Sequence, residues 1–209
     1  MRKDLFYTFL TEFVVLIAGL LVYFFGARLL TMDELGQYML VRRITALILA
    51  TVLLGIAIAL PRYLAISIND ERQRKLYTTS GFLIMLISIA TTVLVLNLFH
   101  GFFSELFFGD RGYAFLVFPM SLLVAATALS ACAYSYYRGR LLMPAANSLH
   151  FLNLGIFALL AILVFHEQGV VTIIQFIALM ILCTSALFSL PALKDAATCI
   201  PHVSFKELK

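Results

Sequence analysis

Two adjacent arginines, Arg42 and Arg43, stand inside a long apolar run and are the first candidates for chemistry in this sequence. An arginine at the centre of a membrane span costs about 2.5–3.5 kcal/mol on insertion scales, so its presence calls for a physical reason. The pair lies about six residues, roughly 9 Å, into a helix that we expect to begin near residue 37. Two interpretations stay open. Both side chains extend to the lipid headgroups, or at least one lines a water-filled cavity where it binds an anionic group.

The first apolar run carries a charged residue near each end, Glu12 and Arg28. A carboxylate in the first turns of a helix is favoured by the helix dipole, which explains Glu12 as an interfacial residue. The alternative is a proton- or cation-coupling site of a transporter. Arg28 is roughly 24 Å further along the same helix, so the two side chains cannot pair. We expect Arg28 at the outer rim of the membrane.

Amide and imidazole side chains mark one face of the fifth apolar run. Asn147, His150 and Asn153 follow each other at intervals of three residues, which places them on one broad face of a helix. Such groups in a membrane usually form hydrogen bonds to neighbouring helices. A face that contacts a sugar is the second interpretation for Asn147 and Asn153.

Signatures of enzymes and of metal sites are absent from the sequence. It contains no GxSxG, HExxH, P-loop or GxGxxG motif, and no span gathers several carboxylates for acid–base work. The cysteines Cys132, Cys183 and Cys199 form no CxxC or Cys/His cluster, so neither a disulfide framework nor a metal site is indicated. We expect no catalytic residue, no metal and no cofactor.

The composition indicates whether these residues lie in water or in a lipid bilayer. Hydrophobic residues make up 63% of the 209 residues and charged residues 12%, with a mean hydropathy of +1.02. A soluble protein of this composition would aggregate through its exposed apolar surface. Six apolar runs are long enough to cross a bilayer as helices, which predicts an all-α polytopic membrane protein, a bundle of about six transmembrane helices. These runs are residues 9–30, 37–60, 76–98, 113–137, 145–165 and 170–193.

The lysines and arginines alternate with the predicted spans. Eleven of the 15 lie at the N-terminus, in the second and fourth loops and in the C-terminal tail, whereas the opposite loops hold two, Arg28 and Arg111. Basic loops stay in the cytoplasm, so both termini are predicted to be cytoplasmic. This topology accounts for the net charge of +4, and no nucleic-acid partner is expected.

Four segments carry a resemblance to a known family. Residues 27–38 (ARLLTMDELGQY) resemble the first-loop motif of bacterial O-antigen-type polysaccharide flippases, which belong to the MOP (multidrug/oligosaccharidyl-lipid/polysaccharide) exporter superfamily. Residues 54–65 and 136–139 are similar to the ends of that family's second and fourth helices, and residues 204–208 to the lead-in to its second lobe. Thr31 and Met32 depart from the motif, because the family usually has glycine there, followed by another small residue or proline.

The resemblance implies a fold and a function. The family has about twelve or more helices in two lobes, so residues 1–198 resemble one six-helix lobe and residues 199–209 a cytoplasmic lead-in to a second. The implied activity is the transfer of an undecaprenyl-diphosphate-linked oligosaccharide across the bacterial inner membrane, with membrane lipids and a second lobe or another chain as partners. Arg42, Arg43, Arg28, Asn147 and Asn153 are then candidates for the wall of the substrate cavity, and Glu12 for coupling. Efflux of drugs or other solutes and a non-catalytic membrane scaffold are the alternatives.

Overall fold

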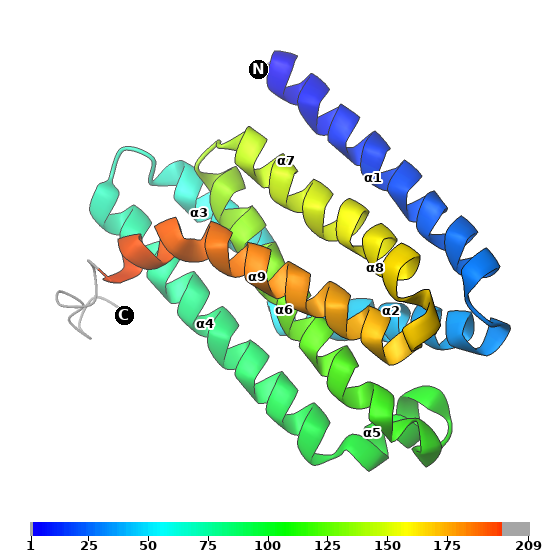
Figure 1. The fold of residues 1–209 in the computed structure, drawn as a ribbon. Coiled ribbons are helices and arrows are strands. Elements are labelled where there is room, and N and C mark those ends of the chain that lie inside the picture. The colour runs from blue at the N-terminus through cyan, green and yellow to red at the C-terminus, as the bar shows by residue number, and fades with distance from the viewer. Residues whose placement is uncertain (1, 198–209) are drawn as a thin grey trace.

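The computed structural model describes the backbone of residues 2–197 and the side chains of residues 7–195. This part of the chain is helical almost throughout and contains no strand. The helices lie roughly along one direction, as Figure 1 shows. They are α1 (Arg2–Leu29), α2 (Met32–Leu53), α3 (Ile56–Ile66), α4 (Glu71–Leu98), α5 (His100–Phe108), α6 (Val117–Gly139), α7 (Met143–Phe151), α8 (Phe157–Phe165) and α9 (Val170–Ala197), with 3₁₀ helices η1 (Arg111–Leu116) and η3 (His166–Gln168) and a π-helix η2 (Leu152–Ile156).

Six helical segments are long and apolar enough to cross a membrane, which confirms the predicted number and the all-α membrane fold. The start of α1, the α3–α4 connection, the α6–α7 connection and the end of α9 lie at one end of the bundle (Figure 1). This is the alternation that the basic loops predicted. The segments are Tyr7–Leu29, Met32–Leu53, Glu71–Leu98, Arg111–Gly139, Met143–Gln168 and Val170–Asp195.

The second span differs from its prediction at both ends. Its helix begins at Met32, because the Thr31 side chain accepts a hydrogen bond from the backbone N–H of Glu34 and the Glu34 carboxylate accepts one from the N–H of Thr31. It ends at Leu53, because Leu54 and Gly55 adopt left-handed backbone angles, with φ of 46° and 77°. The predicted continuation to residue 60 is therefore wrong.

The residues after this break form a separate short helix, α3, with Pro61 inside it. Pro61 follows the second span, but it lies within a helix and does not end one. The apolar composition runs unbroken through residues 52–60, and it hides a break that the backbone of Gly55 permits.

Helix α6 is the centre of the bundle. It packs against α2, α3, α4, α7 and α9, and small side chains such as Ala126, Ala128 and Cys132 are fully buried along it. Cys132 thus acts as a small packing residue; Cys183 is exposed, and Cys199 lies outside the described residues. Helix α1, in contrast, packs along one edge against α7, η2 and α8 (Figure 1).

Glycine allows the closest approach between helices at Gly139. A Cβ atom there would lie 2.7 Å from Leu64 Cβ and 2.9 Å from Pro61 Cα, so α3 reaches α6 only because this residue has no side chain. Gly19 and Gly26 lie seven residues apart on α1, a spacing that puts both on one face of the helix and favours close packing there. A Cβ atom at Gly26 would lie 3.1 Å from the Leu35 side chain, whereas one at Gly19 would meet no described atom within 4 Å.

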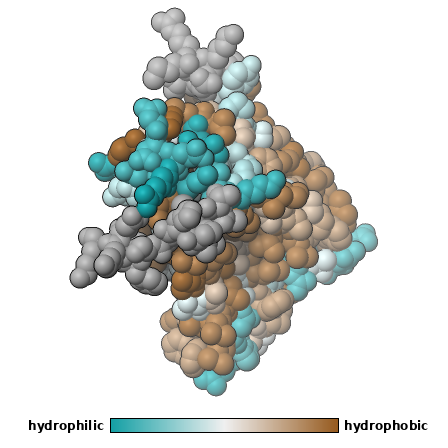
Figure 2. Space-filling model, turned by 90° about the vertical axis from the view of Figure 1, so that its left-hand side faces the viewer, coloured by the Kyte–Doolittle hydropathy of each residue, from teal (hydrophilic) through white to brown (hydrophobic). Residues whose placement is uncertain are grey.

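The end of the bundle with the α3–α4 and α6–α7 connections carries a hydrophilic patch. Figure 2 looks at this end and shows one hydrophilic patch beside broad hydrophobic flanks. The flanks suit contact with lipid chains and the patch suits the aqueous interface, which is the distribution expected of a membrane-spanning bundle.

A candidate polar cavity within the bundle

A cavity of about 160 Å³ lies between α2, α6, η2, α8 and α9. Its polar residues come from three elements, and they bring together two of the residues singled out in the sequence, Arg42 and Asn153. Ala46 and Leu154 at its edge are exposed, so the cavity opens to the surface of the bundle. The full lining is Tyr38, Arg42, Thr45, Ala46, Leu49, Leu123, Thr127, Asn153, Leu154, Ala158, Ile177 and Ile181.

Arg42 supplies the positive charge of this cavity. Because α2 begins at Met32, Arg42 lies roughly 15 Å along the helix, close to its midpoint, and the expected depth of 9 Å was too small. Its Nη1 donates a hydrogen bond to the hydroxyl of the buried Tyr38 at 3.4 Å, and its guanidinium lies 5.8 Å from the centroid of that ring. Among the described side chains no carboxylate pairs with it. Most of its N–H donors are therefore free for an anion.

Arg43 is separated from this site by the geometry of the helix. The side chain of Arg43 is exposed and does not line the cavity. Adjacent residues point about 100° apart on an α-helix, which explains why one arginine faces the cavity and its neighbour does not.

Thr45, one turn after Arg42, was not singled out from the sequence. Its side chain is 5% exposed and its Oγ1 has no hydrogen-bond partner among the described residues. A buried hydroxyl without a partner costs about 1–3 kcal/mol, so a ligand or a water molecule is the expected partner. Threonine is common in membrane helices, and only its spacing of three residues from Arg42 could have drawn attention to it.

Asn153 is held by side chains of two helices. Its Nδ2 donates to Ser130 Oγ at 2.6 Å and to Ser185 Oγ at 3.3 Å, and its Oδ1 accepts from Thr184 Oγ1 at 2.8 Å. These bonds join η2 to α6 and α9, as expected for an amide inside a membrane bundle. The π-helical turn, a form often found at functional sites, places the asparagine toward the cavity.

Asn147 and Glu12 lie elsewhere, in a polar contact between α1 and α7. Asn147 Nδ2 donates to Thr8 Oγ1 at 3.2 Å, and His150 Nε2 lies 3.5 Å from Glu12 Oε1. The His150 ring also stacks on Tyr134, with 5.2 Å between centroids. Asn147 and Asn153 therefore contact different helices and do not share a site. We call the four side chains of Thr8, Glu12, Asn147 and His150 the α1–α7 seam.

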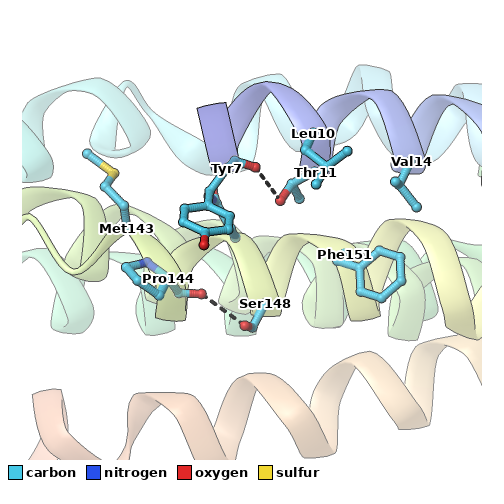
Figure 3. Close-up of a pocket in the computed structure, with 9 residues that line it drawn as sticks. Tyr7, Leu10, Thr11, Val14, Met143, Pro144, Ser148 and Phe151 are labelled. Atoms are coloured by element: carbon cyan, nitrogen blue, oxygen red, sulfur yellow. Dashed lines mark hydrogen bonds between the residues drawn. The ribbon is translucent and has the colours of Figure 1, made fainter. Parts of the chain in front are cut away.

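A larger pocket, of about 420 Å³, lies beside this seam. Figure 3 shows its walls, with Tyr7, Leu10, Thr11 and Val14 on α1 facing a row of α7 residues. The hydroxyls of Thr11 and Ser148 are bonded to carbonyls of their own helices, those of Tyr7 and Pro144, so few polar groups remain for a ligand. The α7 residues are Met143, Pro144, Asn147, Ser148 and Phe151.

Arg28 lies at neither of these sites. It is exposed in the last turn of α1, and its guanidinium lies 4.3 Å from the centroid of the Phe24 ring. In the part of the chain that the structure describes, no three His, Cys, Asp or Glu side chains gather as ligands for a metal ion.

The fold and the cavity define a multi-pass membrane protein with a cationic, partly open cavity between its helices. The chain belongs to the polysaccharide biosynthesis protein family, whose family model matches residues 1–205. This is the family of MOP-type polysaccharide flippases, so the resemblance found in the sequence is confirmed and the role is that of a flippase-type transporter. The family is not catalytic, which is compatible with the lack of enzyme motifs. No curated protein and no solved structure matches the chain significantly.

Proposed function

We propose that this chain forms one lobe of a transporter that moves an undecaprenyl-diphosphate-linked oligosaccharide across the bacterial inner membrane, with both termini in the cytoplasm. The observation that carries the proposal is the charge of Arg42 on the cavity wall, near the middle of α2, with no carboxylate partner among the described residues. A charge at this depth is costly unless it faces water or an anion.

The chemistry of the cavity suits the head of such a substrate. A guanidinium binds a phosphate through two parallel N–H bonds, and Arg42 has donors to spare because its one described hydrogen bond goes to Tyr38. Thr45 Oγ1 and the second lone pair of Asn153 Oδ1 offer partners for sugar hydroxyls or ordered water. The lipid tail needs no site in the cavity, since it remains in the bilayer.

The small size of the cavity supports the proposal that this chain supplies one wall of the path. A volume of about 160 Å³ accommodates one phosphate or one sugar unit, not a whole lipid-linked oligosaccharide. A second lobe or another chain would complete the enclosure, and rocking of the two parts would expose the cavity to each face in turn. Glu12 in the α1–α7 seam is our candidate for coupling this motion to a cation, because its carboxylate meets His150 at a contact between two helices.

The proposal is tested by single substitutions of the two neighbouring arginines in the full-length protein, in the membrane of its own organism. Transport is measured as the lipid-linked oligosaccharide that an externally added lectin can reach. We expect R42A to lower the rate about tenfold or more, since a charge-assisted bidentate contact is lost. R43A is the matched control and should stay within about twofold of the wild type.

Protein level in the membrane is measured in parallel, so that a folding defect is recognised. Equal rates for R42A, R43A and wild type at equal protein level would contradict the role of Arg42 and leave its charge without a function.

Efflux of a small solute is the second candidate, and the small size of the cavity favours it. A single solute molecule fits about 160 Å³ without a second wall of large extent. This alternative predicts that R42A changes resistance to organic anions while the oligosaccharide signal is unaffected. The lectin assay and a resistance assay on the same strains separate the two.

A further inference from the structure

A second basic cavity lies at the hydrophilic end of the bundle, away from Arg42. Its volume is about 170 Å³, and it is lined by residues of α3, α4 and the α6–α7 connection. Two of them are arginines from different elements, Arg74 in α4 and Arg140 after α6. The other lining residues are Leu64, Ile68, Gly139 and Leu142.

The guanidinium of Arg74 makes few hydrogen bonds within the described part of the protein. Its Nη1 reaches the carbonyl oxygen of Ile68 at 3.4 Å, and its Nε is buried without a hydrogen-bond partner among the described residues. The acidic residues at the start of α4 serve other groups, because Asp70 accepts from the N–H of Gln73 and Glu71 pairs with Lys75 at 2.8 Å. A buried guanidinium N–H without an acceptor calls for one from outside the chain.

Arg140 brings a second guanidinium to the same cavity. Its Nη1 donates to the hydroxyl of Tyr136 and lies 3.3 Å from Asp195 Oδ2. The carboxylate of Asp195 is shared, since it also accepts a hydrogen bond from Tyr136 at 2.9 Å. These contacts hold the guanidinium in place through one of its nitrogens, and the remaining donors of Arg140 are oriented by them.

The rim of this cavity is apolar and exposed. Ile68 and Leu142, which line it, are each 45% exposed, and Leu141 beside Leu142 is 60% exposed, although they adjoin the most basic connections of the chain. Exposed leucine and isoleucine next to arginine are typical of a surface at the level of lipid headgroups, where the apolar groups meet the upper acyl chains. Basic pockets between helices on the cytoplasmic side are where anionic lipid headgroups bind.

We propose that the Arg74–Arg140 cavity binds a phosphate group, supplied by the headgroup of an anionic phospholipid in the leaflet that this end of the bundle faces. The phosphate accepts from the Nε–H of Arg74 and from the free donors of Arg140, and the acyl chains lie against the exposed rim. The site is separate from the transport cavity, so it anchors this end of the lobe whether or not the chain carries oligosaccharide.

The binding test uses the full chain in detergent, with phosphatidylglycerol, phosphatidylcholine and inorganic phosphate as separate probes. Native mass spectrometry counts the lipids retained, and thermal stability is followed with each probe. We expect retention of phosphatidylglycerol over phosphatidylcholine, and about tenfold weaker retention in R74Q, because one charge-assisted contact is lost. R62Q, which removes an exposed arginine of α3 at the same end, is the control and should change retention less than about twofold.

The other outcomes decide between sources and against the site. Stabilisation by inorganic phosphate that R74Q abolishes, without retained lipid, would keep the phosphate site and overturn its lipid source. Equal losses in R74Q and R62Q would mean unspecific attraction and would overturn the site. R74K, which keeps the charge but not the Nε–H, should retain less lipid than wild type and guards against a folding defect of R74Q. None of these readouts depends on transport, so their failure would leave the proposed function intact.

Discussion

The centre of the bundle and its edge use polar side chains in opposite ways. Around η2, the amide of Asn153 is bonded to three hydroxyls from two helices and is 3% exposed. In the α1–α7 seam, the described polar contacts between the helices are a hydrogen bond of 3.2 Å and a carboxylate–imidazole contact of 3.5 Å, and the Glu12 side chain is 54% exposed. Polar bonding is therefore denser at the centre than between α1 and α7 among the described side chains, and we expect α1 to exchange its neighbours more readily.

This difference agrees with the way the two regions bury apolar surface. Among the described residues, helix α6 packs against α2, α3, α4, α5, α7 and α9, while α1 leaves a row of large side chains exposed. In a membrane such a row meets lipid or another chain, and it costs nothing there. In the two-lobe transporter that we propose, we expect α6 to belong to the rigid part and α1 to form the surface that changes partners. The exposed row is Phe9, Phe13, Leu16, Leu20 and Phe24.

The largest loss of stability is expected at Gly139, where the contact between α6 and α3 leaves no space for a side chain. G139A places a methyl group 2.7 Å from Leu64 Cβ and 2.9 Å from Pro61 Cα, and should lower the free energy of unfolding by about 2–3 kcal/mol. G19A on α1 is the control, since its methyl group meets no described atom within 4 Å; it should be neutral or stabilise by up to about 1 kcal/mol. Thermal unfolding in detergent measures both. Equal midpoints would show that α3 does not pack tightly on α6.

The second largest loss of stability is expected for substitution of Asn153, and Asn147 provides the comparison. N153A removes three hydrogen bonds, and of the three partners only Thr184 keeps other bonds within the described residues, to carbonyls of its own helix, so the change should cost about 1–2 kcal/mol. N147A removes one bond of 3.2 Å and should cost about 0.5 kcal/mol. The same unfolding assay ranks them. A larger loss for N147A would reverse the assignment of rigid centre and exchangeable edge.

A smaller effect, of opposite sign, is expected at the unpartnered hydroxyl of the cavity. T45V keeps the shape of the side chain and removes the Oγ1 that has no described partner, so stability should rise by up to about 1 kcal/mol. If Thr45 contacts substrate or its water, the transport rate should fall in the same variant. Stability and lectin-accessible oligosaccharide are measured on one preparation. A loss of stability would indicate that Thr45 is bonded within the protein.

The smallest effect on stability is expected in the seam. E12Q weakens a contact of 3.5 Å between a half-exposed carboxylate and His150, and should change the free energy of unfolding by about 0.5 kcal/mol or less. A coupling role predicts a much larger change in transport than in stability. H150Q, which removes the partner, should then reproduce the transport defect. Parallel losses of transport and stability would reduce Glu12 to a packing residue.

The sequence was sufficient to predict the features that the bilayer imposes on each segment independently. The number of spans, their helical form and the alternation of basic loops follow from length, hydropathy and charge, because lipid penalises unpaired backbone and stray charge wherever they occur. Family membership was also accessible, since short motifs in a fixed order survive in residues 27–38 and 54–65. Arg42 was a candidate from the sequence because lipid penalises a charge within a span.

Only the tertiary structure decided which polar residues meet. The break at Leu54 and Gly55 is invisible in a uniformly apolar run, and the early start of α2 moved Arg42 to the middle of its helix. Asn153, in the π-helical turn η2, lines that cavity, while Asn147, less than two turns earlier, forms a hydrogen bond to α1. Such pairings depend on backbone angles and on which helices are neighbours. Hydropathy carries no information about either, because every face of a helix in lipid is apolar whether it meets a lipid chain or another helix.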